Sequence, residues 1–235
     1  MEAIILAGGL GRRLRSVVSD LPKPMAPVLG RPFLEHQMDY WLGQGVTRFV
    51  LSVGYKAEVV RNHFGERYKT AEVAYAVEET PLGTGGGLLL SARLLKSGAP
   101  FLAMNGDTFF RVGLSELLET HRARGAAVTV AVRRVARNDR YSGLDAVADR
   151  RLAAFRSQRG DGRETLINGG VYLMAPDALA DVRWNGRDPI SLEEEVFQAA
   201  LAAGRPFFVH PSEAAFIDIG VPESYREAGS VVADK

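Results

Sequence analysis

The sequence contains no cysteine. This absence excludes disulfide bonds, thiolate metal sites and cysteine nucleophiles, and it suits a reducing compartment such as the cytoplasm. Long apolar stretches are also missing. The first apolar run, residues 3–7, is too short for a signal peptide, and no later run approaches the roughly 20 residues of a membrane span. We therefore expect a cytoplasmic protein with no membrane partner.

An excess of one charge is likewise absent, because 29 Lys and Arg residues are balanced by 28 Asp and Glu residues. Nucleic-acid and membrane-surface binding usually need a concentrated basic excess, so neither partner is predicted. The four histidines show no spacing typical of metal ligands. With 46% hydrophobic and 24% charged residues, the 235-residue chain can bury one sizeable core. We expect a single domain over residues 1–235.

Apolar runs and helical patterns alternate in the first part of the chain. Strands are predicted at residues 3–7, 48–53 and 72–77, and helices at residues 32–44 and 56–64. This βαβα order predicts an α/β fold, in which a Rossmann-like, mostly parallel mixed sheet is flanked by helices. Ligands of such sheets bind beyond the carboxyl ends of the strands.

The later part of the chain is less regular. A strand at residues 100–104 and a helix at residues 114–124 are predicted from their apolar spacing. Between residues 133 and 165, arginines are scattered through short apolar runs, which predicts a small β-rich insert over the ligand site. Ser191 and Glu194 have the spacing of a capping box, so the glutamates at 193–195 are interpreted as partners of a helix dipole rather than as catalysts.

The first predicted strand ends in a glycine-rich loop that is followed by basic residues: Gly8, Gly9, Gly11, Arg12, Arg13, Arg15 and Lys23. Glycines at this place let backbone N–H groups converge on an anion, although a tight turn with solvated arginines would give the same pattern. The Rossmann fingerprint does not fit, because Leu14 stands where its third glycine is needed. The Walker pattern is also absent.

This stretch resembles the sugar nucleotidyltransferases, whose signature joins such a loop to a Pro-Lys-Pro about ten residues later. Here the two parts are Gly8–Leu14 and Pro22–Pro24, and the Pro-Leu-Gly-Thr-Gly segment that the family places over the nucleotide base matches Pro81–Gly85. The resemblance implies that Arg13 and Lys23 are catalytic. It also implies that the nucleotide binds at Leu6, Ala7, Gly8, Gly9, Gly11, Glu79, Pro81, Gly83 and Thr84. If the base is guanine, Glu78 or Glu79 would accept hydrogen bonds from its N1–H and N2–H₂ edge.

Two aspartates are expected to bind Mg²⁺. Asp107 follows a buried strand, where a carboxylate is costly unless it is solvated, hydrogen-bonded or bound to a metal. Asp218 is an isolated acid within the apolar segment Phe216–Gly220. The resemblance assigns both to the metal site. It also implies that the sugar phosphate binds at Asn105, Asn168, Gly169 and Arg156.

Three segments resemble the branch of the family that acts on D-glycero-α-D-manno-heptose 1-phosphate with GTP: Asn105–Phe110, Ile167–Tyr172 and Phe216–Glu223. The expected partners are therefore a nucleoside triphosphate and a sugar 1-phosphate, which are joined with release of pyrophosphate. Arg12 replaces the usual Thr or Ser of the loop, and Arg156–Gln158 replace a Glu-Lys pair of the family, so Arg156 or Arg159 would substitute for the missing lysine.

Several alternatives stay open at this point. A uridylyl-, thymidylyl- or cytidylyltransferase for a hexose or aminosugar 1-phosphate would share the same chemistry, and the oligomeric state is not determined. A non-catalytic sugar-nucleotide sensor would bind ligand without releasing pyrophosphate, but Lys23, Asp107 and Asp218 argue against it. A glycosyltransferase would usually carry an Asp-x-Asp metal motif, which this sequence lacks.

Overall fold

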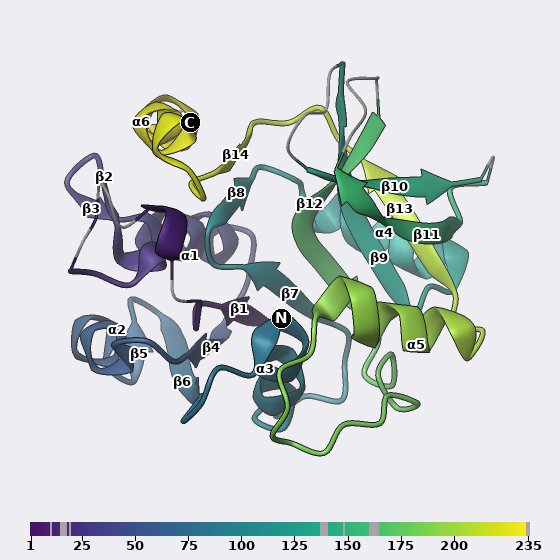
Figure 1. Cartoon of the computed structure of the whole chain (residues 1–235), viewed down its shortest axis with the longest axis horizontal. Coiled ribbons are helices and arrows are strands. Elements are labelled where there is room, and N and C mark those ends of the chain that lie inside the picture. The colour runs from purple at the N-terminus through teal and green to yellow at the C-terminus, as the bar shows by residue number, and fades with distance from the viewer. Residues whose placement is uncertain are drawn as a thin grey trace.

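The computed structural model describes residues 1–9, 11–14, 18, 20–136, 141–147, 149–159 and 165–233, without the side chains of Arg12, Ser142 and 156–159. A ten-stranded sheet forms the centre of this part of the chain (Figure 1). Along it the strands follow the order β11-β10-β12-β7-β1-β4-β6-β5, and β9 pairs with both β12 and β13. The strands of this sheet are β1 (Glu2–Leu6), β4 (Arg48–Val53), β5 (Arg67–Tyr68), β6 (Ala71–Val77), β7 (Phe101–Asn105), β9 (Val128–Val135), β10 (Ser142–Ala146), β11 (Leu152–Arg159), β12 (Thr165–Met174) and β13 (Phe207–Pro211).

The first half of the sheet is parallel. Strand β1 lies between β4 and β7 and is parallel to both, and β6 is parallel to β4. The second half is mixed, because β12 runs antiparallel to β7, β9 and β10. The predicted mostly parallel mixed sheet is therefore confirmed. The carboxyl ends of β1, β4, β6 and β7 meet at one edge, where ligands of such sheets bind.

Helices cover both faces of the sheet (Figure 1). They are α1 (Phe33–Gly43), α2 (Ala57–Phe64), α3 (Gly83–Ala92), α4 (Leu114–Arg124) and α5 (Phe197–Ala202). Another helix, α6 (Pro222–Ala233), packs away from these faces in an apolar cluster of its own. Ile5 of β1 packs in one apolar cluster with residues of α1, α2 and α4, whereas its neighbour Ile4 packs in a second cluster with residues of α3 and α5. Successive side chains of a strand point to opposite faces, so a continuous apolar run buries both. None of the helices in the described ranges has the length and apolar character needed to cross a bilayer.

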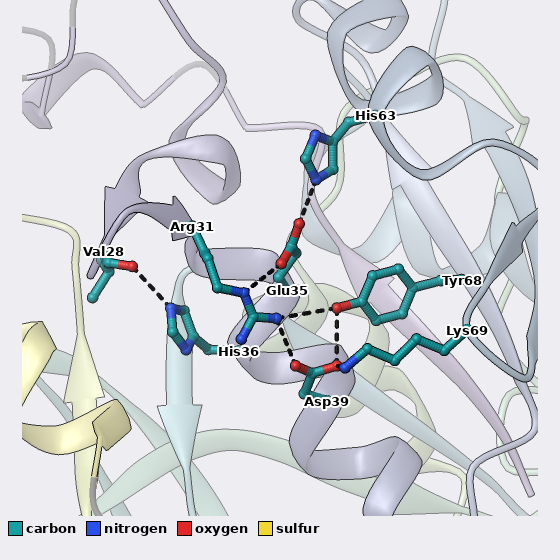
Figure 2. Close-up of polar contacts among 8 residues, drawn as sticks. All are labelled: Val28, Arg31, Glu35, His36, Asp39, His63, Tyr68 and Lys69. Carbon is teal, nitrogen blue, oxygen red and sulfur yellow. Dashed lines mark hydrogen bonds and ion pairs between the residues drawn. The ribbon is translucent and has the colours of Figure 1, made fainter.

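The outer side of α1 is anchored by a charged network (Figure 2). The Arg31 guanidinium donates to the Glu35 carboxylate at 2.6 Å and to the Asp39 carboxylate at 2.6 Å. Asp39 also accepts hydrogen bonds from Tyr68 and Lys69, which lie at β5 and its turn. This network joins α1 to the far edge of the sheet, and α1 in turn supports the site, as described below.

The region between residues 133 and 165 is rich in strands, as predicted. Its strands β10 and β11 pair antiparallel and extend the main sheet beyond β12, instead of forming a separate sheet. Two further two-stranded sheets complete the described structure: β2 (Pro27–Val28) with β3 (Arg31–Pro32), and β8 (Thr108–Phe110) with β14 (Phe216–Asp218).

The pairing of β8 with β14 brings the last part of the chain back to the sheet edge (Figure 1). Asp218 lies opposite Thr108, and the Ile219 amide donates to the Asp107 carbonyl oxygen at 2.9 Å. Helix α6 follows and packs with β14 against Phe33 and Phe109 in a third apolar cluster. The two aspartates predicted to bind a metal are thus placed together by backbone pairing.

Candidate active site

The turn after β7 is fixed from two sides. The Gly106 amide donates to the Leu6 carbonyl oxygen at 2.9 Å, which ties the turn to the end of β1. Gln37, buried on α1, donates from Nε2 to the Asn105 carbonyl oxygen at 2.9 Å and to the Thr108 carbonyl oxygen. The turn therefore presents Asp107 in a fixed position. Apart from its place in an amphipathic helix, no sequence pattern points to this role of Gln37.

Lys23 lies between the two aspartates. Its Nζ contacts an Asp107 carboxylate oxygen and is 3.9 Å from an Asp218 carboxylate oxygen. The short 3₁₀-helix η2 (Lys23–Met25) holds the backbone of Lys23, and only 11% of its side chain is exposed. The structure therefore brings together the three charged residues that the sequence singled out. Among the residues that the structure describes, no group of three or more His, Cys, Asp or Glu side chains is placed to hold a metal ion. The carboxylates next to Lys23 are those of Asp107 and Asp218.

A cavity of about 350 Å³ opens beside Lys23, and we call it the glycine-loop cavity. Its lining includes seven of the predicted nucleotide contacts and both members of the central ion pair: Leu6, Ala7, Gly8, Gly9, Pro81, Gly83, Thr84, Lys23 and Asp107, together with Pro24, Glu78 and Asn105. Gly11 and Arg13 are not part of this lining, and Arg13 is exposed on the 3₁₀-helix η1 (Arg12–Leu14).

Glu78, rather than Glu79, lines the glycine-loop cavity. Its carboxylate accepts hydrogen bonds from the Ser52 hydroxyl at 2.8 Å and from the Leu82 amide at 3.1 Å. Glu79 is exposed and does not line the cavity. The structure therefore places Glu78, and not the predicted Glu79, at this cavity, because hydrogen bonds from the neighbouring strand and turn draw Glu78 inward.

The start of α3 forms one wall of the glycine-loop cavity. Gly83 has φ +72°, and a Cβ there would meet the Ile190 carbonyl group, so glycine is required on both counts. The Thr84 hydroxyl accepts a hydrogen bond from the Leu192 amide at 2.9 Å, and the Gly85 amide donates to the Ile190 carbonyl oxygen at 2.9 Å. This wall is thereby tied to the segment that leads into α5.

A second cavity of about 560 Å³ is lined by Asp218, the more distant of the two aspartates near Lys23, and we call it the aromatic cavity. Three rings and several polar groups line it: Tyr141, Phe155, Phe216, Asn105, Thr108, Asn168, Ser191, Glu193, Glu194, Gln198 and Asp218. Asn105 lines both cavities, and its Oδ1 is buried without a hydrogen-bond partner in the described part of the chain. A larger hollow of about 680 Å³ between α2 and β6 contains none of the predicted site residues.

An irregularity in β12 directs Asn168 into the aromatic cavity. The register between β12 and β9 shifts between Asn168 and Tyr172, as in a β-bulge, and Gly170 has φ +66°. Gly169 lies in this bulge but lines neither cavity, because it packs against the Phe110 ring, which a Cβ would strike. The structure thus shows a packing role for Gly169, and its contact with the sugar stays a prediction. The side chain of Arg156, also predicted there, lies outside the described residues.

Glu193 is the main site residue that the sequence interpretation missed. Its Oε1 accepts hydrogen bonds from the Tyr172 hydroxyl at 2.8 Å and from the Asn168 amide at 3.2 Å. Burial raises the pKa of Glu193, and the nearby Glu194 charge adds to this effect, while the hydrogen bonds from Tyr172, from its own backbone amide and from Asn168 oppose it. A carboxylate held in this way lines a ligand cavity and is more than a partner of a helix dipole.

The expected capping box is present in altered form, which explains why Glu193 turns inward. The Ser191 hydroxyl accepts from the Glu194 amide at 3.2 Å, as predicted, but the Ser191 amide donates to Glu195 at 2.6 Å. In a regular capping box the side chain three residues after the serine accepts from the serine amide, but here the side chain four residues after it does so. The reason is that the first turn, η3 (Leu192–Val196), is π-helical and therefore wider. This wider turn shifts the direction of each side chain.

The comparisons with known proteins agree with this geometry. The D-glycero-α-D-manno-heptose 1-phosphate guanylyltransferase of Aneurinibacillus thermoaerophilus is 40% identical over 97% of this chain and 96% of that protein. The protein of the same name from Campylobacter jejuni subsp. jejuni serotype O:2 is 36% identical over 96% of this chain and 97% of that protein. The solved structure of HddC from Yersinia pseudotuberculosis complexed with GMP-PN has a TM-score of 0.84 at 31% identity, covering 97% of this chain and 98% of that one. Since the nucleotidyl transferase family profile also matches residues 2–235, the chain belongs to the nucleotidyl transferase family.

Proposed function

We propose that this chain is a sugar-1-phosphate guanylyltransferase that converts GTP and D-glycero-α-D-manno-heptose 1-phosphate into GDP-heptose and pyrophosphate. An oxygen of the sugar phosphate attacks the α-phosphorus of GTP. The bond from the α-phosphorus to the oxygen that bridges to the β-phosphorus breaks, and its electron pair leaves with pyrophosphate. A phosphate monoester is largely dianionic near neutral pH, so no general base is required. Catalysis then consists of positioning and charge neutralisation.

The observation that carries this proposal is the Lys23 ammonium at the junction of the two cavities. Lys23 contacts Asp107, which lines the glycine-loop cavity, and lies 3.9 Å from Asp218, which lines the aromatic cavity. Two phosphate groups that meet here, one from each cavity, place their combined negative charge beside Lys23. A fixed cation at this point stabilises the crowded transition state more than either separate substrate.

The glycine-loop cavity has the features that a nucleoside triphosphate needs. Gly8 and Gly9 let the phosphates approach the backbone, and α3 directs its N-terminus toward the same space. We assign Gly11 and the exposed Arg13 to the β- and γ-phosphates at the mouth of the loop. Beside Gly8, the Glu78 carboxylate has acceptor capacity for the N1–H and N2–H₂ donors of guanine, which uracil, thymine and cytosine do not present in this form.

Asp107 and Asp218 also suit a divalent metal, which we propose to be Mg²⁺. This ion prefers oxygen ligands and is usually bound by one or two carboxylates together with substrate phosphates and water. The two aspartates on either side of Lys23 supply such a pair. When bound, the ion would neutralise phosphate charge, while Lys23, the glycine loop and Glu78 position the nucleotide.

The choice of sugar is supported by the two bacterial relatives that carry the heptose 1-phosphate guanylyltransferase name and match nearly the full length of this chain. On this chain the sugar would occupy the aromatic cavity, with Asn105 and Asn168 among its polar lining. Its phosphate would lie at the end of the cavity that Asp218 and Lys23 form.

The decisive test is pyrophosphate release in Mg²⁺ buffer, with GTP, UTP, dTTP, CTP and ATP each combined with manno-heptose, mannose, glucose and N-acetylhexosamine 1-phosphates. We expect turnover with GTP and the manno-heptose phosphate. Lys23→Met should lower kcat by about 100-fold or more without changing the melting temperature. Lys96→Met, which removes an exposed lysine paired with Glu72, is the matched control and should keep wild-type kcat. Turnover with another pair would refute the substrate assignment, and ligand binding without turnover for any pair would indicate a sensor.

A further inference from the structure

Asn168, the expected sugar ligand, is already occupied by protein groups. Its Oδ1 accepts a hydrogen bond from the Gly170 amide at 3.0 Å. Its Nδ2 donates to the Tyr172 hydroxyl at 2.6 Å and to Glu193 Oε1 at 3.2 Å. A side-chain amide has two N–H donors, and both are used here. Asn168 is therefore better placed to orient its neighbours than to read a ligand.

The chain of donors that starts at Asn168 ends at Glu193. The hydroxyl of Tyr172, which is fully buried on β12, donates a hydrogen bond to the same Glu193 oxygen at 2.8 Å. Both of these bonds go to Oε1, so the carboxylate is locked in orientation while Oε2 receives no side-chain donor from the described residues. The described side chains also place no cation within ion-pair distance of Glu193, although it lines the aromatic cavity.

A partly buried carboxylate with unused acceptor capacity needs hydrogen-bond donors from elsewhere. A phosphate cannot provide them, because it is itself anionic and would be repelled. The hydroxyl groups of a neutral sugar ring can, and the rings of Tyr141, Phe155 and Phe216 in the same cavity offer apolar surface for the C–H groups of that ring. Hydrogen bonds to a charged acceptor are stronger than neutral ones, so each contributes more to discrimination.

We propose that Glu193 is the specificity-determining residue of the sugar site, and that its carboxylate accepts a hydrogen bond from a ring hydroxyl of the sugar 1-phosphate. The Asn168 and Tyr172 side chains act as positioning groups that aim it. This inference rests on the proposed function and narrows its substrate class. Sugars that lack this hydroxyl, and sugars that carry a carboxylate in its position, should be rejected. The phosphate end of the sugar is left to Lys23 and Asp218.

The experiment compares Glu193→Gln with wild type. The glutamine keeps an Oε1 acceptor for Tyr172 and Asn168, so a purely structural role would survive, but it replaces the ligand-facing acceptor with an N–H₂ donor. We expect KM for the sugar 1-phosphate to rise about 10- to 100-fold while KM for GTP stays within about twofold. Glu195→Gln removes a charge from the same helical turn without touching either cavity, and it should match wild type. Equal effects of both variants would reduce Glu193 to a helix-dipole role and overturn the inference.

A series of monodeoxy sugar 1-phosphates identifies the hydroxyl directly. Wild type should reject one member of the series by a large factor, and Glu193→Gln should lose that discrimination while still penalising the other members. If Glu193→Gln does not fold, Glu193→Asp, which keeps the charge but withdraws it by one methylene, should weaken sugar binding in calorimetry without affecting GTP. Wild-type turnover with a different sugar or base refutes the substrate assignment but leaves this comparison intact with that substrate. An unchanged sugar KM in the variants refutes the role of Glu193 alone.

Discussion

Gly106→Ala tests whether the turn that carries Asp107 is held as rigidly as the structure indicates. The backbone at Gly106 has an ordinary φ, so the substitution introduces no conformational strain of its own. The added Cβ, however, would lie 2.7 Å from the Leu6 carbonyl oxygen and 3.3 Å from the Ala7 Cα. Both of these atoms belong to backbone at the end of β1. Neither can rotate away as a side chain could, so the turn itself has to move.

The magnitude follows from two costs. Overpacking against fixed backbone costs about 1 to 3 kcal/mol, and the stretched hydrogen bond from the Gly106 amide to Leu6 costs about 1 kcal/mol. We therefore expect a loss of about 3 kcal/mol in the free energy of unfolding, which lowers the melting temperature of a chain of this length by roughly 6 to 12 °C. A displacement of Asp107 by about 1 Å should also lower kcat about 100-fold.

The assay combines thermal unfolding with pyrophosphate release at a temperature well below both transitions. Gly98→Ala is the matched control, because Gly98 is exposed, has no positive φ and would place its Cβ in open space. It should change stability by less than about 1 kcal/mol and leave kcat unchanged. If Gly106→Ala keeps the wild-type melting temperature and kcat, the turn is not clamped by β1 and the reasoning about Asp107 fails.

Three further predictions concern charge. Burial opposes ionisation of Asp39, but its hydrogen bonds outweigh burial and lower its pKa, so Arg31→Met should cost about 1 kcal/mol at pH 7, measured by urea unfolding. This cost should begin to shrink as the pH falls below about 4, where the unfolded chain takes up the proton, and should be lost only below the lowered pKa of Asp39 in the fold. Burial raises the pKa of Glu193, so above the ordinary pKa of a glutamate the fold must hold an unfavourable buried charge or an extra proton, and either lowers its stability. Glu193→Gln removes this cost and should therefore raise the melting temperature at pH 7.5 but not at pH 4. Glu78→Gln should lower kcat/KM for GTP about 10- to 100-fold, in steady-state assays, with little effect on the sugar KM.

Much of the fold could be predicted because its signals are local. The strand at residues 48–53 and the helix at residues 114–124 have the expected bounds, since continuous burial and helical spacing are written into the sequence. The sheet edge that carries Lys23 and Asp107 was also predictable. A glycine loop and an acidic turn each directly follow a buried strand, and the carboxyl ends of parallel strands lie at the same edge. Only the family resemblance joined Asp218 to this edge, since Asp218 lies 111 positions after Asp107 and no local pattern joins them.

The remaining site residues depend on contacts that sequence spacing does not contain. Glu78 and Glu79 are neighbours of the same type, and only the hydrogen bonds from Ser52 and Leu82 select Glu78. Glu193 was hidden by the capping pattern around it, since a π-helical turn changes which glutamate caps the helix and which one faces the cavity. Such choices are made by packing between distant elements, so they can be predicted only once the neighbours are placed.

The pairing of β8 with β14 has a consequence for the time at which the enzyme becomes active. During synthesis the glycine loop, Lys23 and Asp107 leave the ribosome early, whereas Asp218 emerges with the last strand and helix. Until β14 docks beside β8, the aromatic cavity lacks Phe216 and Asp218 from its lining, and the Asp107 carbonyl oxygen lacks its bond from Ile219. If Lys23, Asp107 and Asp218 act together as proposed, a nascent chain can bury most of its sheet before it can join the two substrates, and the docking of β14 completes the site.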